Sequence, residues 1–331
     1  MRISTSPSRR HLLCAAAALC ALTSPLTTAW AQEYPTRPVT LVMPFPPGGG
    51  GDAQARTLAQ ALGEKLGQSV IVDNRPGAGT AIGAAHVANA KPDGYTLLLS
   101  SNSTYTMNPA IRPSLPYDPV KSFQPVGVYS RVGLVLLANP SVPVNNLKEF
   151  MAAVKADPQK YSYASFGTGT SSHFAAELAL QAMGLKMTHI PYKGSAPAMT
   201  DLIGGQLPFS FDTMTAALPQ VKAGKVKAIA VTTAKRSAML PSVPTFAESG
   251  VPGVTLDAWG MMVVPRGTPA PVVAKLEKAL QDTMAMPSIR EALAKQGVEA
   301  TFMGSTQAAQ LLESELPLMR AVAARANIQV D

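Results

Sequence analysis

Short apolar runs alternate along this chain with longer segments in which apolar residues recur every three or four positions. In the first third, the runs predict strands, and the longer segments, one of them between Asp52 and Gly67, predict helices. The predicted order is strand 39–43, helix 53–66, strand 70–72, helix 80–89 and strand 95–99. This β-α-β-α-β order is typical of a mostly parallel sheet with helices on its faces.

The same alternation begins again after residue 130. The predicted elements there are strand 134–137, helix 147–154, strand 161–165, helix 173–183, strand 189–190, helix 197–203 and strands 209–211 and 227–232. A strand at 255–264 would return the chain to its first half, followed by helices near 269–285, 288–295 and 306–326. We therefore predict two α/β lobes, with residues 32–130 and 255–331 in domain 1 and residues 131–254 in domain 2.

The N-terminus has the pattern of an export signal. Arginines at positions 2, 9 and 10 precede an apolar run at 12–22 that is too short to span a bilayer, which takes ~20 residues. Ala29-Trp30-Ala31 is a cleavage pattern, so residues 1–31 are predicted to be a signal peptide and the mature chain to begin at Gln32. Ser8 to Leu12 also resembles a twin-arginine motif, which leaves both the Sec and the twin-arginine route open.

Composition narrows the class of protein. The chain of 331 residues is 47% hydrophobic and 15% charged, which is enough apolar material for a large core. Cleavage would remove both cysteines and three arginines, leaving 25 basic and 20 acidic residues, a net charge of +5. A mature chain without cysteine has no disulfide, no thiolate nucleophile and no cysteine-ligated metal. There is no run of five like charges, so we expect no nucleic-acid partner.

Four predicted strand-to-helix turns consist of Gly, Ser, Thr and Pro: 47–52, 77–80, 167–172 and 194–196. In parallel α/β sheets such turns lie at the carboxyl edge, where ligands bind. Helix N-termini there present unpaired N–H groups and a partial positive charge, which together hold a carboxylate without Lys or Arg. Two lobes with such turns predict a small carboxylate in a cleft between them. The alternative is that the glycines only permit tight turns.

The first turn also admits an enzymatic interpretation. Gly48-x-Gly50-x-x-Ala53 follows a strand, and Asp73 comes 20 residues after Ala53, which meets a permissive dinucleotide fingerprint. Pro46 and Pro47 argue against it, because they remove two N–H donors from the loop. Patterns such as G-x-S-x-G and H-E-x-x-H do not occur in the sequence. We therefore favour a binding protein without cofactor or metal over an exported enzyme.

Three single residues keep two interpretations each. His173 could point into the cleft or cap the start of a helix. Asp212 could receive an amino group of a ligand or cap the following helix. Trp259 could line the cleft or pack in the core.

Several stretches of this chain, in this order, resemble the Bug-type periplasmic receptors of tripartite tricarboxylate transporters. They are Pro44-Phe45-x-Pro47-Gly48-Gly49-x-x-Asp52 with Ala55-Arg56, 74–79, 92–97, 115–119, Ser171-Ser172-His173, 191–198, 204–206, 230–232 with Lys235-Arg236, and Pro244-Thr245. The resemblance runs from about Tyr34 to the C-terminus. The chain departs from it at Gly50-Gly51, where a Pro or Thr is more frequent beside the Asp.

The resemblance implies a type II periplasmic-binding-protein fold, with crossovers near residues 130 and 255 and a ligand cleft between the lobes. It also implies that loop backbone and water hold a carboxylate ligand. The residues carried over to this site are Phe45, Pro47, Gly48, Gly49, Asp52, Asn102, Ser103, Thr104, Gly169, Thr170, Ser171, Ser172, His173, Lys193, Gly194, Ser195, Ala196 and Asp212.

The implied function is that of an exported, monomeric receptor that binds a mono-, di- or tricarboxylate or an amino acid. It would deliver this ligand to the membrane permease of a tripartite transporter and would catalyse no reaction. Two alternatives remain open. One is an exported enzyme with a dinucleotide-type loop, and the other is a sensor that signals to a membrane kinase.

Overall fold

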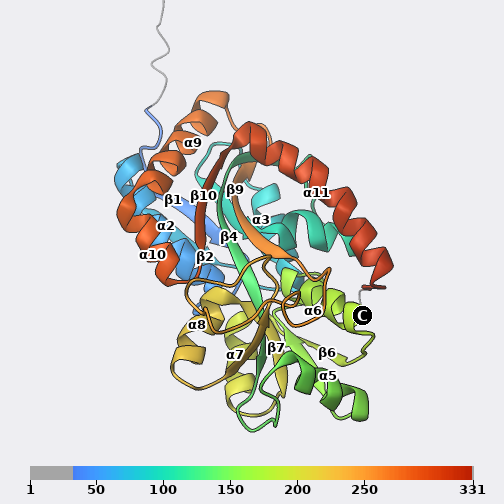
Figure 1. Cartoon of the computed structure of the whole chain (residues 1–331). Coiled ribbons are helices and arrows are strands. Elements are labelled where there is room, and N and C mark those ends of the chain that lie inside the picture. The colour runs from blue at the N-terminus through green and yellow to red at the C-terminus, as the bar shows by residue number, and fades with distance from the viewer. Residues whose placement is uncertain (1–32, 330–331) are drawn as a thin grey trace, which may run out of the picture. The chain divides into compact units, whose positions relative to one another are not determined.

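The computed structural model describes residues 33–329, of which those from Arg37 onward form one compact unit. The predicted signal peptide at 1–31 lies outside the described residues. The strands of the unit belong to two sheets that share one long strand, β4 (Phe123–Ala138), which runs from one set of strands into the other (Figure 1).

The first sheet has the order β2-β1-β3-β9-β4, with β10 on the other edge of β4. Its remaining strands are β1 (Val39–Met43), β2 (Val70–Asn74), β3 (Thr96–Ser101), β9 (Asp257–Pro265) and β10 (Glu299–Gly304). The apolar run of β1 is largely buried on both faces, as expected for a parallel strand whose sheet is covered by helices. Helices from both ends of the chain flank this sheet: α2 (Gly50–Leu66), α3 (Ala81–Ala88), α9 (Ala270–Ala285), α10 (Pro287–Lys295) and α11 (Ser305–Arg325).

The second sheet has the order β4-β7-β5-β6, and β8 also pairs with β4. Its strands are β5 (Ser162–Ser165), β6 (Thr188–Pro191), β7 (Phe209–Thr213) and β8 (Lys227–Val231). The helices that accompany it are α5 (Leu147–Ala156), α6 (Ser171–Met183), α7 (Ser195–Ile203) and α8 (Met214–Lys222). The α/β class predicted from the sequence is confirmed, and strand-to-helix turns lead into α6 and α7.

The sheets are mixed and not mostly parallel as predicted. The ladders β2-β1-β3 and β6-β5-β7 are parallel, whereas every ladder of β4 and the β3-β9 ladder are antiparallel. The difference arises because β4 runs through both sheets and is antiparallel to each of its partners, β9, β10, β7 and β8. β4 pairs with β9 as far as Gly133 and with β7 from Leu134 onward, so the predicted boundary at 130/131 falls inside this strand.

Several elements around the first sheet differ from the sequence prediction. Helix α2 begins at Gly50, with Gly49 as its N-cap, and not after Asp52. It ends as predicted at Gly67, whose φ of 70° is left-handed. A single turn of π-helix at Ser103–Met107 (η2) and a short helix at Asn108–Ile111 (α4) follow β3, and strand β10 was not predicted. The first turn of α2 and η2 both lie beside the candidate site.

Candidate functional site

A small cavity, partly open, lies between the two sheets. Its volume is about 60 Å³, more than the ~10–15 Å³ that one water requires, so it has room for a few waters or a small organic molecule. The predicted site residues Phe45, Gly49, Ser171, Ser195 and Asp212 line it. Asp212 is the one charged residue among the described residues of this lining.

The N-terminus of helix α2 forms one wall of the cavity. Gly49, Gly50 and Gly51 line it, and the N-cap Gly49 provides no side-chain hydrogen bond to the first turn. The first N–H groups of a helix have no partner within the helix, so they can donate to a ligand. A Cβ at Gly50 would lie 2.7 Å from Oγ1 of Thr213, which belongs to the second sheet. Glycine is therefore needed here so that backbone and opposite sheet can approach.

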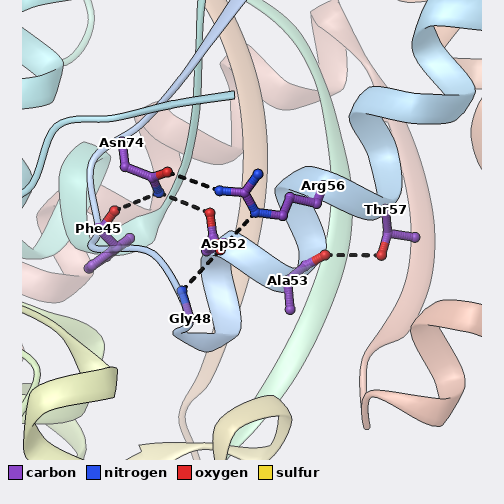
Figure 2. A network of polar contacts seen from close by, with 7 residues as sticks. All are labelled: Phe45, Gly48, Asp52, Ala53, Arg56, Thr57 and Asn74. Carbon is purple, nitrogen blue, oxygen red and sulfur yellow. Dashed lines mark hydrogen bonds and ion pairs between the residues drawn. The ribbon is translucent and has the colours of Figure 1, made fainter. Parts of the chain in front are cut away.

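A polar network on the far side of α2 holds the loop that precedes it (Figure 2). One carboxylate oxygen of Asp52 accepts hydrogen bonds from the backbone N–H of Gly48 and from Nε of Arg56, both at 3.0 Å. Nδ2 of Asn74 donates to the other oxygen of Asp52 and to the carbonyl of Phe45, again at 3.0 Å. Asp52 thus contacts protein donors and does not line the cavity. It positions the loop before α2.

The pKa of Asp52 reflects this network. Burial raises the pKa, but the hydrogen bonds from Arg56, Gly48 and Asn74 outweigh burial and hold it below the ordinary value of 3.8. The carboxylate is therefore ionised at neutral pH.

Helix α6 approaches the cavity from the second sheet. The backbone N–H of Ser171 donates to Oγ of Ser103 at 2.9 Å, and this hydroxyl in turn lies 3.4 Å from Oγ of Ser171. These contacts join π-turn η2 of the first sheet to the start of α6. Oγ of Thr170 donates to the Gly167 carbonyl at 2.6 Å, which tightens the turn before the helix.

Asp212 lies at the end of β7, beside the first residue of α7. Oγ of Ser195 donates to its Oδ2 at 2.6 Å, and the backbone N–H of Thr213 donates to its Oδ1 at 2.7 Å. The side chain is fully buried, and burial raises its pKa to about 6 even though these hydrogen bonds lower it. Thr213, not Asp212, is the N-cap of α8, because its side chain accepts from the N–H of Ala216. The helix-cap interpretation of Asp212 is therefore wrong.

The stretch Asn102-Ser103-Thr104 is buried but does not line the cavity. Thr104 shares hydrogen bonds of 2.5 and 2.7 Å with Ser100 and Thr80, and Nδ2 of Asn102 donates to the Asp257 carbonyl. The two preceding residues, Ser100 and Ser101, face the cavity instead.

His173 lies behind the turn at 167–170 and not in the cavity. Its ring stacks on His189 with 4.1 Å between centroids, and Nδ1 accepts from the N–H of Gly169 at 3.3 Å. Burial and the neighbouring His189 lower its pKa to about 3, which keeps the ring neutral.

Lys193 is exposed and lines a second cavity of about 180 Å³, together with Arg112. Phe45 and Phe166 line both cavities and contact each other edge to face, with 5.8 Å between centroids. The two rings therefore lie between the first cavity, here called the inner cavity, and the second, the outer cavity, whose lining includes the cationic side chains of Arg112 and Lys193.

The remaining predicted residues do not line the inner cavity; they are Pro47, Gly48, Gly169, Thr170, Ser172, Gly194 and Ala196.

The sequence patterns did not indicate every residue that lines the inner cavity. Gln54 lies one turn into α2, receives a hydrogen bond of 3.2 Å from Oγ of Ser130, and donates to Oγ1 of Thr215 across the sheets at 3.4 Å. Trp259 is both buried and part of the lining, so its two interpretations hold together. Its Nε1 donates to Glu315 of helix α11 at 2.8 Å, and Oγ1 of Thr106 donates to the same carboxylate at 2.8 Å. The helical spacing of residues in α2 could have indicated Gln54, whereas no pattern in the sequence around Glu315 indicates its role.

The described residues, 33–329, contain no group of three or more His, Cys, Asp or Glu side chains placed to hold a metal ion. Within the same range, no helix is both long and apolar enough to cross a membrane.

Similarity to known proteins defines the class. The sequence profile of the tripartite tricarboxylate transporter family receptor matches residues 54–328, so this chain belongs to that family. Protein BugT of Bordetella pertussis is 36% identical, over 86% of this chain and 88% of BugT. A protein of Agrobacterium vitis from the TAR-I ttuE-ttuC′ intergenic region is 40% identical, over 81% of this chain and 78% of the relative.

Solved structures of the family have the same fold. Periplasmic binding protein BugD superposes with a TM-score of 0.87 at 38% identity, covering 89% of this chain and 99% of BugD. R. palustris Rpa4515, solved with adipate, has a TM-score of 0.87 at 35% identity over 89% of this chain and 99% of its own. MatC from Rhodopseudomonas palustris, with bound malate, has a TM-score of 0.84 at 33% identity over 87% and 99%. The chain is a periplasmic-type solute-binding receptor by family and by fold.

Proposed function

We propose that this receptor captures a small carboxylate between its two sheets and delivers it to the membrane permease of a tripartite tricarboxylate transporter. The observation that carries the proposal is the cavity itself, which the N-termini of α2 and α7 enter from opposite sheets. Gly194, the N-cap of α7, also provides no side-chain hydrogen bond to its helix. Because the lining within residues 33–329 includes no Lys or Arg, backbone N–H groups are the donors for an anion.

We further propose that the sheets belong to two lobes, 32–130 with 255–331 and 131–254, which close on the ligand. Contacts across the sheets support a closed form: Ser103 with Ser171, and Gln54 with Thr215. The adipate and malate complexes superpose with TM-scores of 0.87 and 0.84, whereas a Polaromonas relative of 28% identity solved without ligand reaches 0.62. A ligand favours closure only through contacts that the closed form alone makes.

We propose a binding role without catalysis, in the periplasm and as a monomer. The cavity is too small for a dinucleotide, and Asp73, which would bind its ribose, instead accepts from Arg75 at 2.7 Å. The receptor would thus transfer its ligand unchanged. A sensor that presents the same closed form to a membrane kinase is the second reading of this fold, and binding to a kinase ectodomain would identify it.

Isothermal titration of the chain from Gln32 onward, freed of co-purified ligand, tests the proposal. We expect one-to-one binding of at least one small carboxylate and no binding of nicotinamide dinucleotides. A matched pair of variants locates the site: Gly50→Val, which adds a side chain against Thr213, and Gly63→Ala on the same helix away from the cavity. Loss of binding in the first and retention in the second supports the proposal, whereas dinucleotide binding would refute it.

A further inference from the structure

Helix α6, which accompanies the second sheet, is bonded to elements of the first sheet near both of its ends. At its start, the backbone N–H of Ser171 donates to Oγ of Ser103 in η2 at 2.9 Å. Near its end, Nε2 of Gln181 donates to the carbonyl of Arg325, the last residue of α11, at 2.6 Å, and Figure 1 shows the end of α11 beside α6. Ser171 and Gln181 are ten positions apart, or ~15 Å along a helix, so the second contact lies outside the inner cavity.

The Arg325 carbonyl is available for this contact because of the way in which α11 ends. The last four carbonyls of a helix have no partner within the helix. Those of residues 322–324 accept hydrogen bonds of 2.9–3.3 Å from the N–H groups of residues 326–328, in a turn where Asn327 has a left-handed φ of 50° and Ile328 is buried. The Arg325 carbonyl is the fourth, and a side chain from the other sheet provides its donor.

The middle of α11 is bonded to the lining of the inner cavity. Glu315 accepts hydrogen bonds of 2.8 Å from Nε1 of Trp259, which lines the cavity, and from Oγ1 of Thr106 in η2. Ser103 lies in the same π-helical turn as Thr106. Helix α11, η2 and this part of the lining are thus one bonded unit, and this unit contacts α6 near both of its ends.

We propose that Gln181 and the Arg325 carbonyl form a latch, which is bonded only when the two lobes are closed and which slows the release of the bound carboxylate. This inference rests on the proposed closure of the lobes and adds a contact outside the cavity that determines affinity. Gln181 does not line the cavity, so it is a positioning residue that holds the closed form and does not contact the ligand. When the lobes are open, both groups of the latch form hydrogen bonds to water instead.

Removal of the latch should change one rate constant of binding and not the other. The ligand enters the open form, in which the latch is not bonded, so the association rate does not depend on Gln181. Release requires opening, which breaks the hydrogen bond. One intramolecular hydrogen bond is sufficient to change the release rate and the Kd by about 3- to 10-fold. The melting temperature of the ligand-free, open protein should stay nearly the same.

The test is a matched pair of variants of residues 32–331, which include every described residue. Gln181→Met keeps the length and the helix propensity of the side chain but removes its N–H donor. Gln310→Met makes the same change at an exposed position of α11. The probes are succinate, L-malate, adipate and L-glutamate. Stopped-flow measurement of the emission of Trp259, the one tryptophan of residues 32–331, follows association and release, and calorimetric titration measures Kd.

We expect Gln181→Met to release each bound probe about 3- to 10-fold faster than the unchanged protein, with the same association rate. Gln310→Met should match the unchanged protein. Equal release rates and equal Kd in Gln181→Met and the unchanged protein would overturn the latch but leave the proposed function intact. A loss of affinity that comes from slower association, or with a lower melting temperature of the ligand-free variant, would also overturn the latch, because its effect would not be confined to the closed form. Absence of binding by every probe and every other small carboxylate would overturn the proposed function and the latch with it.

Discussion

The two walls of the cavity use the same chemistry, an uncapped helix N-terminus, but support it in different ways. On the first wall, the loop before α2 is held by the ion pair of Asp52 and Arg56 and by Asn74, all on the side away from the cavity. On the second wall, the carboxylate of Asp212 lies buried in the cavity itself, next to the start of α7. Charge therefore positions the backbone on one wall and lies in the lining of the cavity on the other.

The largest effect is expected where the two walls meet. In Gly50→Val, the added Cβ lies 2.7 Å from Thr213 Oγ1 and 3.1 Å from Thr215 Cβ, so the sheets cannot approach. We expect ligand affinity to fall by ~100-fold, the upper part of the cost of overpacking, while the melting temperature changes little. Isothermal titration checks this, with Gly63→Ala as the control. Unchanged affinity in Gly50→Val would show that the two walls do not close on each other.

Disruption of the first wall should come next. Asp52→Ala removes the acceptor for Gly48, Arg56 and Asn74, and we expect a loss of about 2–3 kcal/mol in unfolding free energy and ~10-fold in affinity. Because the folded pKa lies below 3.8, the stabilisation is present above that pH and is lost as pH falls through the lowered value. Urea unfolding at several pH values measures it. A pH-independent difference between the variant and the unchanged protein would contradict an ionised Asp52.

Some features of the fold could be predicted from local sequence, and others could not. The α/β order, the end of α2 at Gly67 and the glycine turns followed from local periodicity and turn chemistry. The shared strand β4 did not, because a strand that serves two sheets has no distinct pattern at the point where its partners change.

Local sequence likewise indicated only some of the residues of the candidate site. The glycine turns pointed to Gly49, Ser171 and Ser195, which line the cavity, but the role of Asp52 depends on Asn74, 22 residues away in the sequence. His173 follows a small-residue turn just as a ligand residue would, yet its ring packs on His189, which only the tertiary fold brings near.

A smaller effect is expected at Trp259, which also lines the cavity. Burial raises the pKa of Glu315, although its hydrogen bonds from Trp259 and Thr106 lower it. Glu315→Leu should cost about 1–3 kcal/mol, because it leaves the buried Nε1–H of Trp259 without its acceptor, whereas the hydroxyl of Thr106 keeps the Asn102 carbonyl. It should also shift the emission of Trp259, the one tryptophan of residues 32–331. Glu315→Gln, which keeps an acceptor oxygen, serves as the control, and equal spectra in both variants would contradict a direct role of this hydrogen bond.

The smallest effect should follow from the exposed end of the first network. The side chain of Arg56 is 56% exposed, so Arg56→Gln should change unfolding free energy by less than about 1 kcal/mol and affinity by less than about threefold. An effect as large as that of Asp52→Ala would mean that the ion pair, and not the backbone and amide hydrogen bonds, holds the loop. Urea unfolding and titration, run beside Asp52→Ala, distinguish these outcomes.

The most direct test of the account is a crystal structure of residues 32–331 with the tightest-binding small carboxylate. The account predicts that the ligand carboxylate lies within hydrogen-bond distance of the backbone N–H groups of residues 49–51. A carboxylate bound in the outer cavity, against Arg112 and Lys193, would contradict the account. It would show that side-chain cations and not helix N-termini hold the ligand.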